Sequence, residues 1–261
     1  MHSILDLETY PLDRPGSAEW QALVDTCRAD LAAHGMFNLV GLMRPDVASQ
    51  VVDDTSGLFD SDAFLHARRH NIYFRDVDGL APDHPALMQF ETSNRTLCAD
   101  QIAGSPLLRL YGWPEFARFL AATMQMTQLH VMDDPLASVN VMAYREGQAL
   151  NWHFDRSEFT TTLLLQGAKS GGEFEYRTNL RGDDDPNYDG VARLLAGQDP
   201  DTRKITLSPG TLNVFRGKNT AHRVTPVRGD RSRVIAVLSY YQTPGVRFSE
   251  TERVGFYGRA S

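Results

Sequence analysis

A histidine and an aspartate stand two residues apart in the segment Trp152-His153-Phe154-Asp155. On a β-strand both side chains would point to one face, because side chains alternate along an extended chain. A second histidine, His222, follows downstream in Ala-His-Arg-Val-Thr-Pro-Val. This spacing has the form of a 2-His-1-carboxylate triad, which binds iron(II) on one face and leaves the other positions open. The alternative is that both histidines are hydrogen-bonded structural residues without a metal.

An arginine completes the candidate site. Arg233 lies eleven residues after His222 and begins the apolar run Arg-Val-Ile-Ala-Val-Leu-Ser-Tyr. A planar guanidinium holds a carboxylate through two parallel hydrogen bonds. A dicarboxylic keto acid that chelates iron at one end needs such a partner at its other end. Arg228 and Arg231 compete for this role, but they lie closer to the Gly229-Asp230 turn, so we favour Arg233.

Three further polar residues lie on strands expected near this site. Tyr144 stands nine residues before His153, and its hydroxyl is placed to reach the keto acid, although it could simply pack in the core. Thr162 is a second candidate for the same ligand. Asn140 is a candidate for contact with substrate.

The strands that would position these residues are recognised from the turn residues that separate them. From Ser138 onward, short β-like runs alternate with glycine-rich breaks, a pattern typical of a sandwich or small barrel and not of βαβ units. The eight expected strands are Ser138–Tyr144, Leu150–Asp155, Phe159–Gln166, Glu173–Tyr176, Lys204–Leu207, Thr211–Phe215, His222–Val227 and Arg233–Tyr241. The polar, acidic stretch 178–202 is expected to be a long loop with a helical turn at Val191–Leu195, and loops of this length are usually functional or mobile.

The first half of the chain is predicted to be helical. Ser17 suits a helix N-cap and Gly35 suits the matching C-terminus, while Pro45 and Pro114 suit helix first turns. Trp20, Leu23, Val24, Cys27 and Leu31 then form one apolar stripe. We therefore expect one domain over 1–261, with a mostly helical part (1–137), a β core (138–242) and a C-terminal segment (243–261).

The remaining histidines of the first half have no evident role. His66, His70 and His84 fall in a stretch that we expect to be irregular, and surface positions are favoured for them.

Composition limits the classes of function. The chain has 261 residues, 42% of them hydrophobic, and a formal net charge of −7. That charge disfavours a nucleic-acid or anionic-membrane partner, which a basic face would attract. No apolar run reaches membrane-spanning length, and the first residues lack the features of a signal peptide. The two cysteines are far apart, so a reducing, cytoplasmic setting is the simplest expectation.

On this strand pattern, His153, Asp155, His222 and Arg233 resemble the iron(II)- and 2-oxoglutarate-dependent oxygenases. The resemblance implies a mainly β fold with flanking helices (α+β), a double-stranded β-helix of the jelly-roll, cupin-like kind with a helical buttress. It implies Fe(II), 2-oxoglutarate and O2 as cofactor and cosubstrates, with ascorbate as a reductant. His153, Asp155 and His222 would hold the metal, and Arg233 would pair with the 5-carboxylate of 2-oxoglutarate.

Several longer phrases are similar to a bacterial branch of free amino-acid hydroxylases and amino-acid radical halogenases. They are Trp152–Phe159, Gly171–Tyr176, His222–Val227, Phe256–Arg259, Asp83–Pro85 and Tyr111–Trp113. Within these phrases and the core, Arg156, Tyr257 and Asn140 are the candidates for substrate contact.

Asp155 distinguishes the two activities of that branch. The halogenases have glycine at this position, where chloride takes the vacant coordination site, whereas the aspartate fills it here. The resemblance therefore implies hydroxylation of an unactivated C–H bond in a small metabolite, a free amino acid or derivative, with release of succinate and CO2. Desaturation or cyclisation by the same cofactor chemistry, in natural-product biosynthesis, is the nearest alternative.

Other classes stay open on sequence grounds. A cupin-type isomerase or a thiol- or ring-cleaving dioxygenase would keep the metal without needing Arg233. A non-catalytic metal-binding sensor is the alternative of another class, and retention of the triad together with Arg233 disfavours it. A macromolecular substrate is disfavoured because no basic strip interleaved with aromatic residues is visible. Substrate identity and oligomeric state cannot be read from the sequence.

Overall fold

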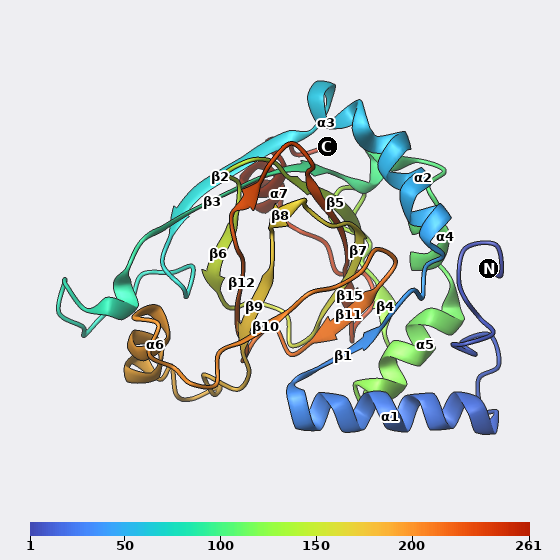
Figure 1. The fold of residues 1–261 in the computed structure, drawn as a ribbon, viewed down its shortest axis with the longest axis horizontal. Helices are drawn as coiled ribbons and strands as arrows, with labels where there is room; N and C mark the ends of the chain where they lie inside the picture. The colour runs from blue at the N-terminus through green and yellow to red at the C-terminus, as the bar shows by residue number, and fades with distance from the viewer.

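Two β-sheets that face one another form the centre of the structure, a computed structural model describing residues 1–261 (Figure 1). The large sheet has seven strands in the order β1-β11-β7-β14-β5-β3-β2, and the small sheet has four in the order β10-β9-β12-β6. The large-sheet strands are β1 (Met36–Leu39), β2 (Phe64–His70), β3 (Phe90–Leu97), β5 (Val139–Tyr144), β7 (Thr160–Gln166), β11 (Leu212–Phe215) and β14 (Arg233–Leu238). The small-sheet strands are β6 (Leu150–His153), β9 (Phe174–Arg177), β10 (Arg203–Ile205) and β12 (Ala221–Val224).

The chain alternates between these sheets. β5, β7, β11 and β14 belong to the large sheet, while β6, β9 and β12, which come between them in the chain, belong to the small one. All pairings in both sheets are antiparallel. This alternation is the double-stranded β-helix that was predicted, and each of the eight expected strands corresponds to an observed one. The β structure is completed by two short strand pairs. In one, β13 (Val227–Arg228) pairs with β8 (Ser170–Gly171), and in the other, β15 (Tyr240–Tyr241) pairs with β4 (His130–Val131).

Aromatic packing joins the two sheets. The ring centroid of Phe215 on the large sheet lies 5.3 Å from that of Phe174 on the small sheet and 4.7 Å from that of His222. Met36, Tyr176 and Val224 belong to the same buried cluster. The inner faces of the sheets are therefore in contact at one end of the roll, next to the second predicted metal ligand.

Helices cover the outer face of the large sheet, from the top of Figure 1 along its right side to the bottom. They are α1 (Ala18–His34), α2 (Pro45–Ser56), α3 (Leu58–Ser61), α4 (Pro106–Tyr111) and α5 (Pro114–Thr123). Their apolar side chains share the largest hydrophobic cluster with Leu163, Val214 and Val141 of the sheet. Burial of this apolar surface, at roughly 25 cal/mol per Å², is the main force that holds the helices on the sheet.

The predicted ends of α1 are confirmed. The Ser17 hydroxyl accepts a hydrogen bond from the backbone N–H of Trp20 at 3.1 Å. Gly35 follows the helix with φ of 70°, the left-handed conformation that glycine adopts without steric cost. α2 and α5 begin at Pro45 and Pro114, as expected from proline's fixed φ.

The first 137 residues hold more β structure than expected. β1, β2 and β3 extend the large sheet at both of its edges, and short 3₁₀ turns occupy Pro85–Leu87 and Ala99–Ile102. The placement of His66 and His70 in an irregular surface region was wrong, because both lie in β2, and His70 is buried. The polar, charged residues of β2 hid its strand character, since an edge strand with a polar face shows no apolar alternation.

Two segments flank the roll. The acidic stretch 178–202 carries α6 (Tyr188–Leu195), which projects on the left of Figure 1 and packs with residues from 72–86 in a small separate cluster. The C-terminal segment forms α7 (Glu250–Tyr257), held by Arg253, which pairs with Asp134 at 2.9 Å. No helix combines the length and apolar character that crossing a bilayer requires.

Candidate metal centre

The two predicted histidine ligands lie directly opposite each other on neighbouring strands. His153 is the last residue of β6, His222 is the second residue of β12, and the two are paired in register. Their ring centroids are 4.0 Å apart, and both side chains are buried. Antiparallel pairing thus brings together two imidazoles that are distant in the sequence.

A backbone carbonyl orients each imidazole. Nδ1 of His153 lies 2.8 Å from the carbonyl oxygen of Asn151, and Nδ1 of His222 lies 3.0 Å from that of Thr220. A carbonyl oxygen only accepts hydrogen bonds, so each Nδ1 carries the proton and donates it. The lone pair of each Nε2 is left free for a metal, and partners of this kind fix the ring orientation of metal ligands.

Asp155 lies between the free nitrogens, just beyond the end of β6, which is two residues shorter than the predicted strand. Its Oδ1 is 3.2 Å from Nε2 of His153, and its Oδ2 is 3.5 Å from Nε2 of His222. The Thr160 hydroxyl donates a hydrogen bond to Oδ2, and the Asp155 backbone N–H donates to the Gly217 carbonyl at 3.1 Å. Thr160 therefore holds the carboxylate, and Gly217 holds the backbone of Asp155.

The charge states follow from these contacts. Burial and the neighbouring His153 lower the pKa of His222 to about 4, although Asp155 opposes the shift. Burial alone would raise the pKa of Asp155, but the imidazoles of His222 and His153 and the Thr160 hydroxyl outweigh it and hold that pKa well below 3.8. At neutral pH the site thus presents a neutral His222 imidazole beside an ionised carboxylate, as metal binding requires.

The donor set fits iron(II). One ligand atom from each of His153, Asp155 and His222 lies within 4.8 Å of the other two. Two imidazole nitrogens and one carboxylate oxygen on one side of an ion leave its other positions open, which is the non-haem iron arrangement. A closed structural zinc site would use four protein ligands.

Arg233 and Tyr144 lie on the large sheet. They are paired in register on β14 and β5, and the Arg233 guanidinium carbon is 5.9 Å from the Tyr144 ring centroid. Both are buried, and Nη1 of Arg233 has no hydrogen-bond partner. Burial raises the pKa of Tyr144 to about 12, with Arg233 lowering it and Asp155 raising it, so the Tyr144 hydroxyl experiences both the guanidinium and the metal-site carboxylate.

The unpaired guanidinium fits the distal carboxylate of 2-oxoglutarate. Buried arginines are normally paired, because an isolated buried charge is costly. Arg233 also lines a cavity of about 360 Å³ that Gly172 and Leu164 border. A Cβ on Gly172, whose φ is +61°, would lie 3.2 Å from Cδ of Arg233, so glycine leaves space for the arginine stem. The protein thus supplies one end of a site for a small dicarboxylate.

The other predicted residues have varied surroundings. Thr162 is buried on β7, paired with Val237 and not with Arg233, and its hydroxyl donates to the Asn213 carbonyl at 3.4 Å. Asn140 Oδ1 accepts a hydrogen bond from the Tyr257 hydroxyl at 2.9 Å, which joins β5 to α7. These residues stay predictions for ligand contact.

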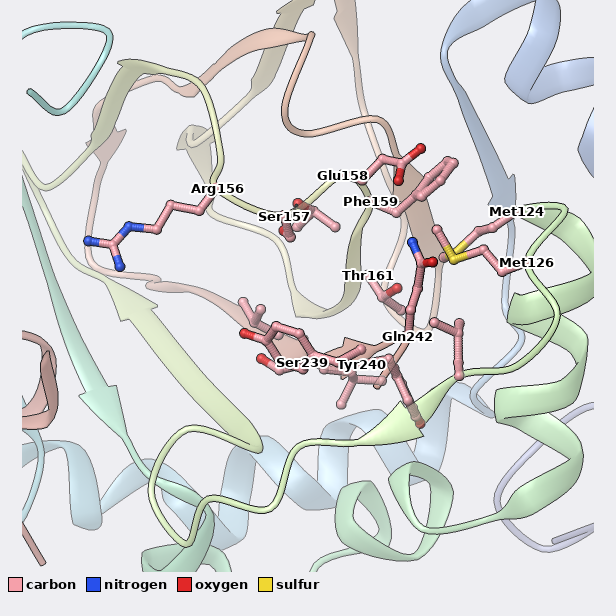
Figure 2. A pocket seen from close by; sticks show the side chains of 15 residues that line it. Met124, Met126, Arg156, Ser157, Glu158, Phe159, Thr161, Ser239, Tyr240 and Gln242 are labelled. Atoms are coloured by element: carbon pink, nitrogen blue, oxygen red, sulfur yellow. Dashed lines mark hydrogen bonds between the residues drawn. The ribbon is translucent and has the colours of Figure 1, made fainter. Parts of the chain in front are cut away.

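Arg156 directly follows Asp155 and lies at the protein surface. Its guanidinium is 3.0 Å from Glu252 and its side chain is exposed. Arg156 also belongs to a second cavity, of about 310 Å³, which includes Thr160 and Tyr241. Figure 2 shows the Arg156 side chain reaching away from Met124 and Met126, which line the opposite side of this cavity. Thr160, which binds Asp155, is among the lining residues of this cavity, while His153, Asp155 and His222 are not.

Sequence reasoning missed two contributors, Thr160 and Phe74. Thr160 was inside a predicted strand, but a threonine in a strand carries no distinguishing signal. Phe74 lies outside any strand with φ of +55°, its ring 5.4 Å from that of His153 and 4.1 Å from that of His70. No spacing rule points to a residue in a left-handed conformation, which for a bulky side chain is uncommon and strained.

Comparison with known proteins agrees with this geometry. The family model described as halogenase D matches residues 19–252. The chain belongs to the halogenase D family. This membership confirms the predicted oxygenase superfamily and an enzyme, and the match includes all three ligand positions and Arg233. No protein of curated function matches the sequence.

Solved structures share the fold. The epimerase SnoN from nogalamycin biosynthesis, titled as non-haem and alpha-ketoglutarate-dependent, matches with a TM-score of 0.58 at 12% identity, over 84% of this chain and 83% of that chain. AviO1 from Streptomyces viridochromogenes matches with a TM-score of 0.56 at 13% identity, over 85% and 96%. A 2OG-Fe(II) oxygenase family oxidoreductase from Burkholderia pseudomallei matches with 0.50 at 17%, over 89% and 94%. These matches confirm the double-stranded β-helix.

Proposed function

We propose that this halogenase D family member is a 2-oxoglutarate-dependent hydroxylase of a small metabolite, a free amino acid or a derivative of one. The observation that carries the proposal is the pairing of a complete His153–Asp155–His222 donor set with an unpaired, buried Arg233 on the facing sheet. Iron(II) and 2-oxoglutarate, when bound, supply oxidation of an unactivated C–H bond by O2, with release of succinate and CO2.

The protein's own residues provide position and polarity. His153, Asp155 and His222 would hold the iron, and Arg233 would bind the far carboxylate of 2-oxoglutarate through its planar fork. The Tyr144 hydroxyl, whose one polar contact within the protein is a 3.9 Å approach to the Met142 sulfur, is free to donate to the same ligand. Burial of both Arg233 and Tyr144 keeps water from this end of the site and strengthens those contacts.

Asp155 favours hydroxylation over halogenation. Its two oxygens lie beside the free nitrogens of both histidines, so the third protein position around the metal is filled. The Thr160 hydroxyl holds the carboxylate in this place, and the Gly217 carbonyl holds the Asp155 backbone. A halide would have to displace an ionised carboxylate that is hydrogen-bonded in the folded protein. Transfer of oxygen to substrate is therefore the expected outcome, with desaturation and cyclisation as the related oxidations.

The cavity in Figure 2 supports a small substrate. Its volume of about 310 Å³ lies at the lower end of the range for small-molecule sites. It joins apolar side chains, among them Met124, Met126 and Leu129, with a few polar ones near the metal-site threonine, Thr160. This mixture suits a metabolite with both an aliphatic part and charged groups.

The decisive experiment measures succinate and product together. Purified protein with iron(II), 2-oxoglutarate and ascorbate is screened against free amino acids in buffer that contains chloride. We expect succinate release that depends on one substrate class, and a product that gains one oxygen atom and no chlorine. A chlorinated product would contradict hydroxylation, and a loss of two hydrogens would favour desaturation or cyclisation.

Two histidine variants test the ligand assignment in the same experiment. The variant His222→Ala should lose the absorption band that appears when iron(II) and 2-oxoglutarate are added without oxygen. The variant His34→Ala changes an exposed residue at the end of α1 and should keep it. Iron binding without any consumption of 2-oxoglutarate would favour the non-catalytic sensor and reject the enzyme proposal.

A further inference from the structure

The edge strand β2 presents an arginine on the same sheet face as the 2-oxoglutarate residues. Arg68 is paired with Thr92 on β3. Four residues along β3, and so on the same face, Thr96 is paired with Met142 on β5. Tyr144 follows Met142 by two positions and shares its face. The register therefore places Arg68 on the inner face of the large sheet, at its free edge.

One aromatic ring separates Arg68 from a metal ligand. The guanidinium carbon of Arg68 lies 4.6 Å from the centroid of the Phe74 ring. The Phe74 ring in turn meets the His153 ring edge-on, with centroids 5.4 Å apart. Phe74 has a left-handed backbone, φ +55°, a strained conformation for a bulky residue. Strain of this kind beside a metal ligand is typical of a segment shaped for binding.

A second arginine, Arg156, approaches the same face of β2 through an aromatic ring. Arg156 directly follows Asp155, and its guanidinium carbon lies 5.5 Å from the Phe256 ring centroid. The Phe256 ring is stacked on His66, with centroids 6.2 Å apart, and His66 is two residues before Arg68 on β2. Burial and the positive charge of Arg156 both lower the pKa of Arg68, so the two guanidinium groups repel each other.

One acidic residue, Glu252, pairs with Arg156, and no carboxylate forms an ion pair with Arg68. Burial and then Arg156 lower the pKa of Arg68. Glu252 pairs with Arg156, but its other oxygen accepts hydrogen bonds from the backbone N–H and hydroxyl of Ser249 and caps α7. Burial and then Arg68 lower the pKa of His66, which is therefore neutral at pH 7. Arg68 is therefore a positively charged side chain without an acidic partner, in a chain whose formal net charge is −7.

We propose that Arg68, assisted by Arg156, binds an anionic group on the side chain of the substrate. The substrate would then be an acidic metabolite that carries a carboxylate or phosphate beyond any α-carboxylate, and basic amino acids would be excluded. An α-carboxylate alone fits less well, because its neighbouring ammonium group would stand beside the same two guanidiniums. This inference rests on the proposed function, since it names the substrate class of that site.

Binding of matched probes tests the charge preference without turnover. The protein is loaded with zinc, which supports no oxidation, and with 2-oxoglutarate, and titrated by calorimetry with L-glutamate, L-glutamine, O-phospho-L-serine and L-lysine. L-Glutamate and L-glutamine have nearly the same shape and differ in side-chain charge. We expect an acidic probe to bind at least about tenfold more tightly than L-glutamine, as charge-assisted hydrogen bonds do, and L-lysine to bind most weakly. Whether L-glutamate or O-phospho-L-serine binds more tightly distinguishes carboxylate from phosphate.

Arginine variants test which residues cause the preference for an acidic probe. Arg68→Gln should remove the preference for the acidic probe, and Arg156→Gln should reduce it. Arg69→Gln is the matched control, because Arg69 is the next residue of β2, is exposed and points to the opposite face. The proposal is overturned if the wild-type protein binds L-glutamine as tightly as the acidic probes, if Arg68→Gln keeps the preference, or if no probe binds.

Different results would reject the proposed function and the anion subsite. A charge preference that depends on Arg68, without 2-oxoglutarate consumption by the iron-loaded enzyme, would reject the proposed function and leave the anion subsite standing. Oxidation of neutral or basic substrates, with unchanged rates in Arg68→Gln, would uphold the enzyme and reject the subsite.

Discussion

Tyr144 and Arg233 face each other across β5 and β14, and the buried guanidinium has no partner at Nη1. The protein therefore maintains a desolvated positive charge next to a phenol whose hydroxyl is itself almost unpaired. Such an arrangement is costly in the free protein and becomes favourable when an anion occupies it. Under the proposed function, this pair is the part of the 2-oxoglutarate site that the fold holds ready at the expense of stability.

Replacing this arginine should separate stability from binding. We predict that Arg233→Met leaves the ligand-free protein as stable as the wild type or more stable, by about 1–3 kcal/mol, since apolar packing replaces an unpaired buried charge. The same variant should bind 2-oxoglutarate about 100-fold more weakly or worse, because the buried partner of its carboxylate is gone. Denaturant unfolding and calorimetry measure the two effects. Loss of stability together with intact binding would contradict the assignment of Arg233.

We expect the Thr160 hydroxyl to affect the affinity for iron(II). It donates to the Asp155 carboxylate, and partners of this kind typically change metal affinity 10- to 100-fold. We predict that Thr160→Val, which keeps the shape, weakens iron(II) binding by about tenfold without unfolding the protein. Thr161→Val is the control, because Thr161 pairs with Val214 on the helix-facing side of the sheet. Equal iron affinity in the two variants would remove Thr160 from the site.

Gly217 should be intolerant of a side chain. A Cβ built on Gly217 would overlap the Thr160 hydroxyl and lie 2.5 Å from Oδ2 of Asp155. We predict that Gly217→Ala displaces the carboxylate and lowers iron affinity by more than Thr160→Val does. Gly57→Ala is the control, since Gly57 has helical φ and ψ and open space around it, and alanine there should be neutral or slightly stabilising. Both variants are compared by iron titration and by thermal unfolding.

The sequence predicted the core of the site because its signals are local. His153 and Asp155 are two residues apart, and the strands that carry His222 and Arg233 are marked by glycine turns and β-branched runs. Period-two alternation and turn chemistry were therefore sufficient to place His153, His222 and Arg233 on strands, with Asp155 just beyond the end of β6. The sequence also located the ends of α1, because Ser17 and Gly35 act through their own backbone conformations.

The opening of the site was not predictable in the same way. β2 is an edge strand rich in basic residues, and Arg68 shares a face with Tyr144 only through pairing with β3 and then β5. The register of β2 relative to β5, set through β3, depends on tertiary pairing, so the local sequence pattern does not predict it. The strained backbone of Phe74 and the docking of α7 beside Arg156 likewise depend on packing.

Asp134 should anchor the C-terminal helix in a pH-dependent way. Its buried carboxylate accepts hydrogen bonds from the backbone N–H groups of Leu136, Ala137 and Phe248 and pairs with Arg253. Burial alone would raise the pKa of Asp134, but these contacts outweigh it and hold the pKa below 3.8. Because the folded protein binds the proton less tightly than the unfolded chain, this stabilisation is complete above about pH 4 and is lost as the pH falls through the folded-state pKa.

We predict that Asp134→Asn lowers the free energy of unfolding by about 3 kcal/mol at pH 7, since it leaves Arg253 without its charge partner. The difference from the wild type should shrink as the pH falls below 4, where the wild-type carboxyl also becomes neutral. Asp133→Asn is the matched control. Asp133 pairs with Arg247 through exposed side chains, so its loss should change stability by less than about 1 kcal/mol. Denaturant unfolding from pH 7 to pH 3 measures both, and a constant difference for Asp134→Asn over that range would show that the hydrogen bonds, and not the charge, hold α7 in place.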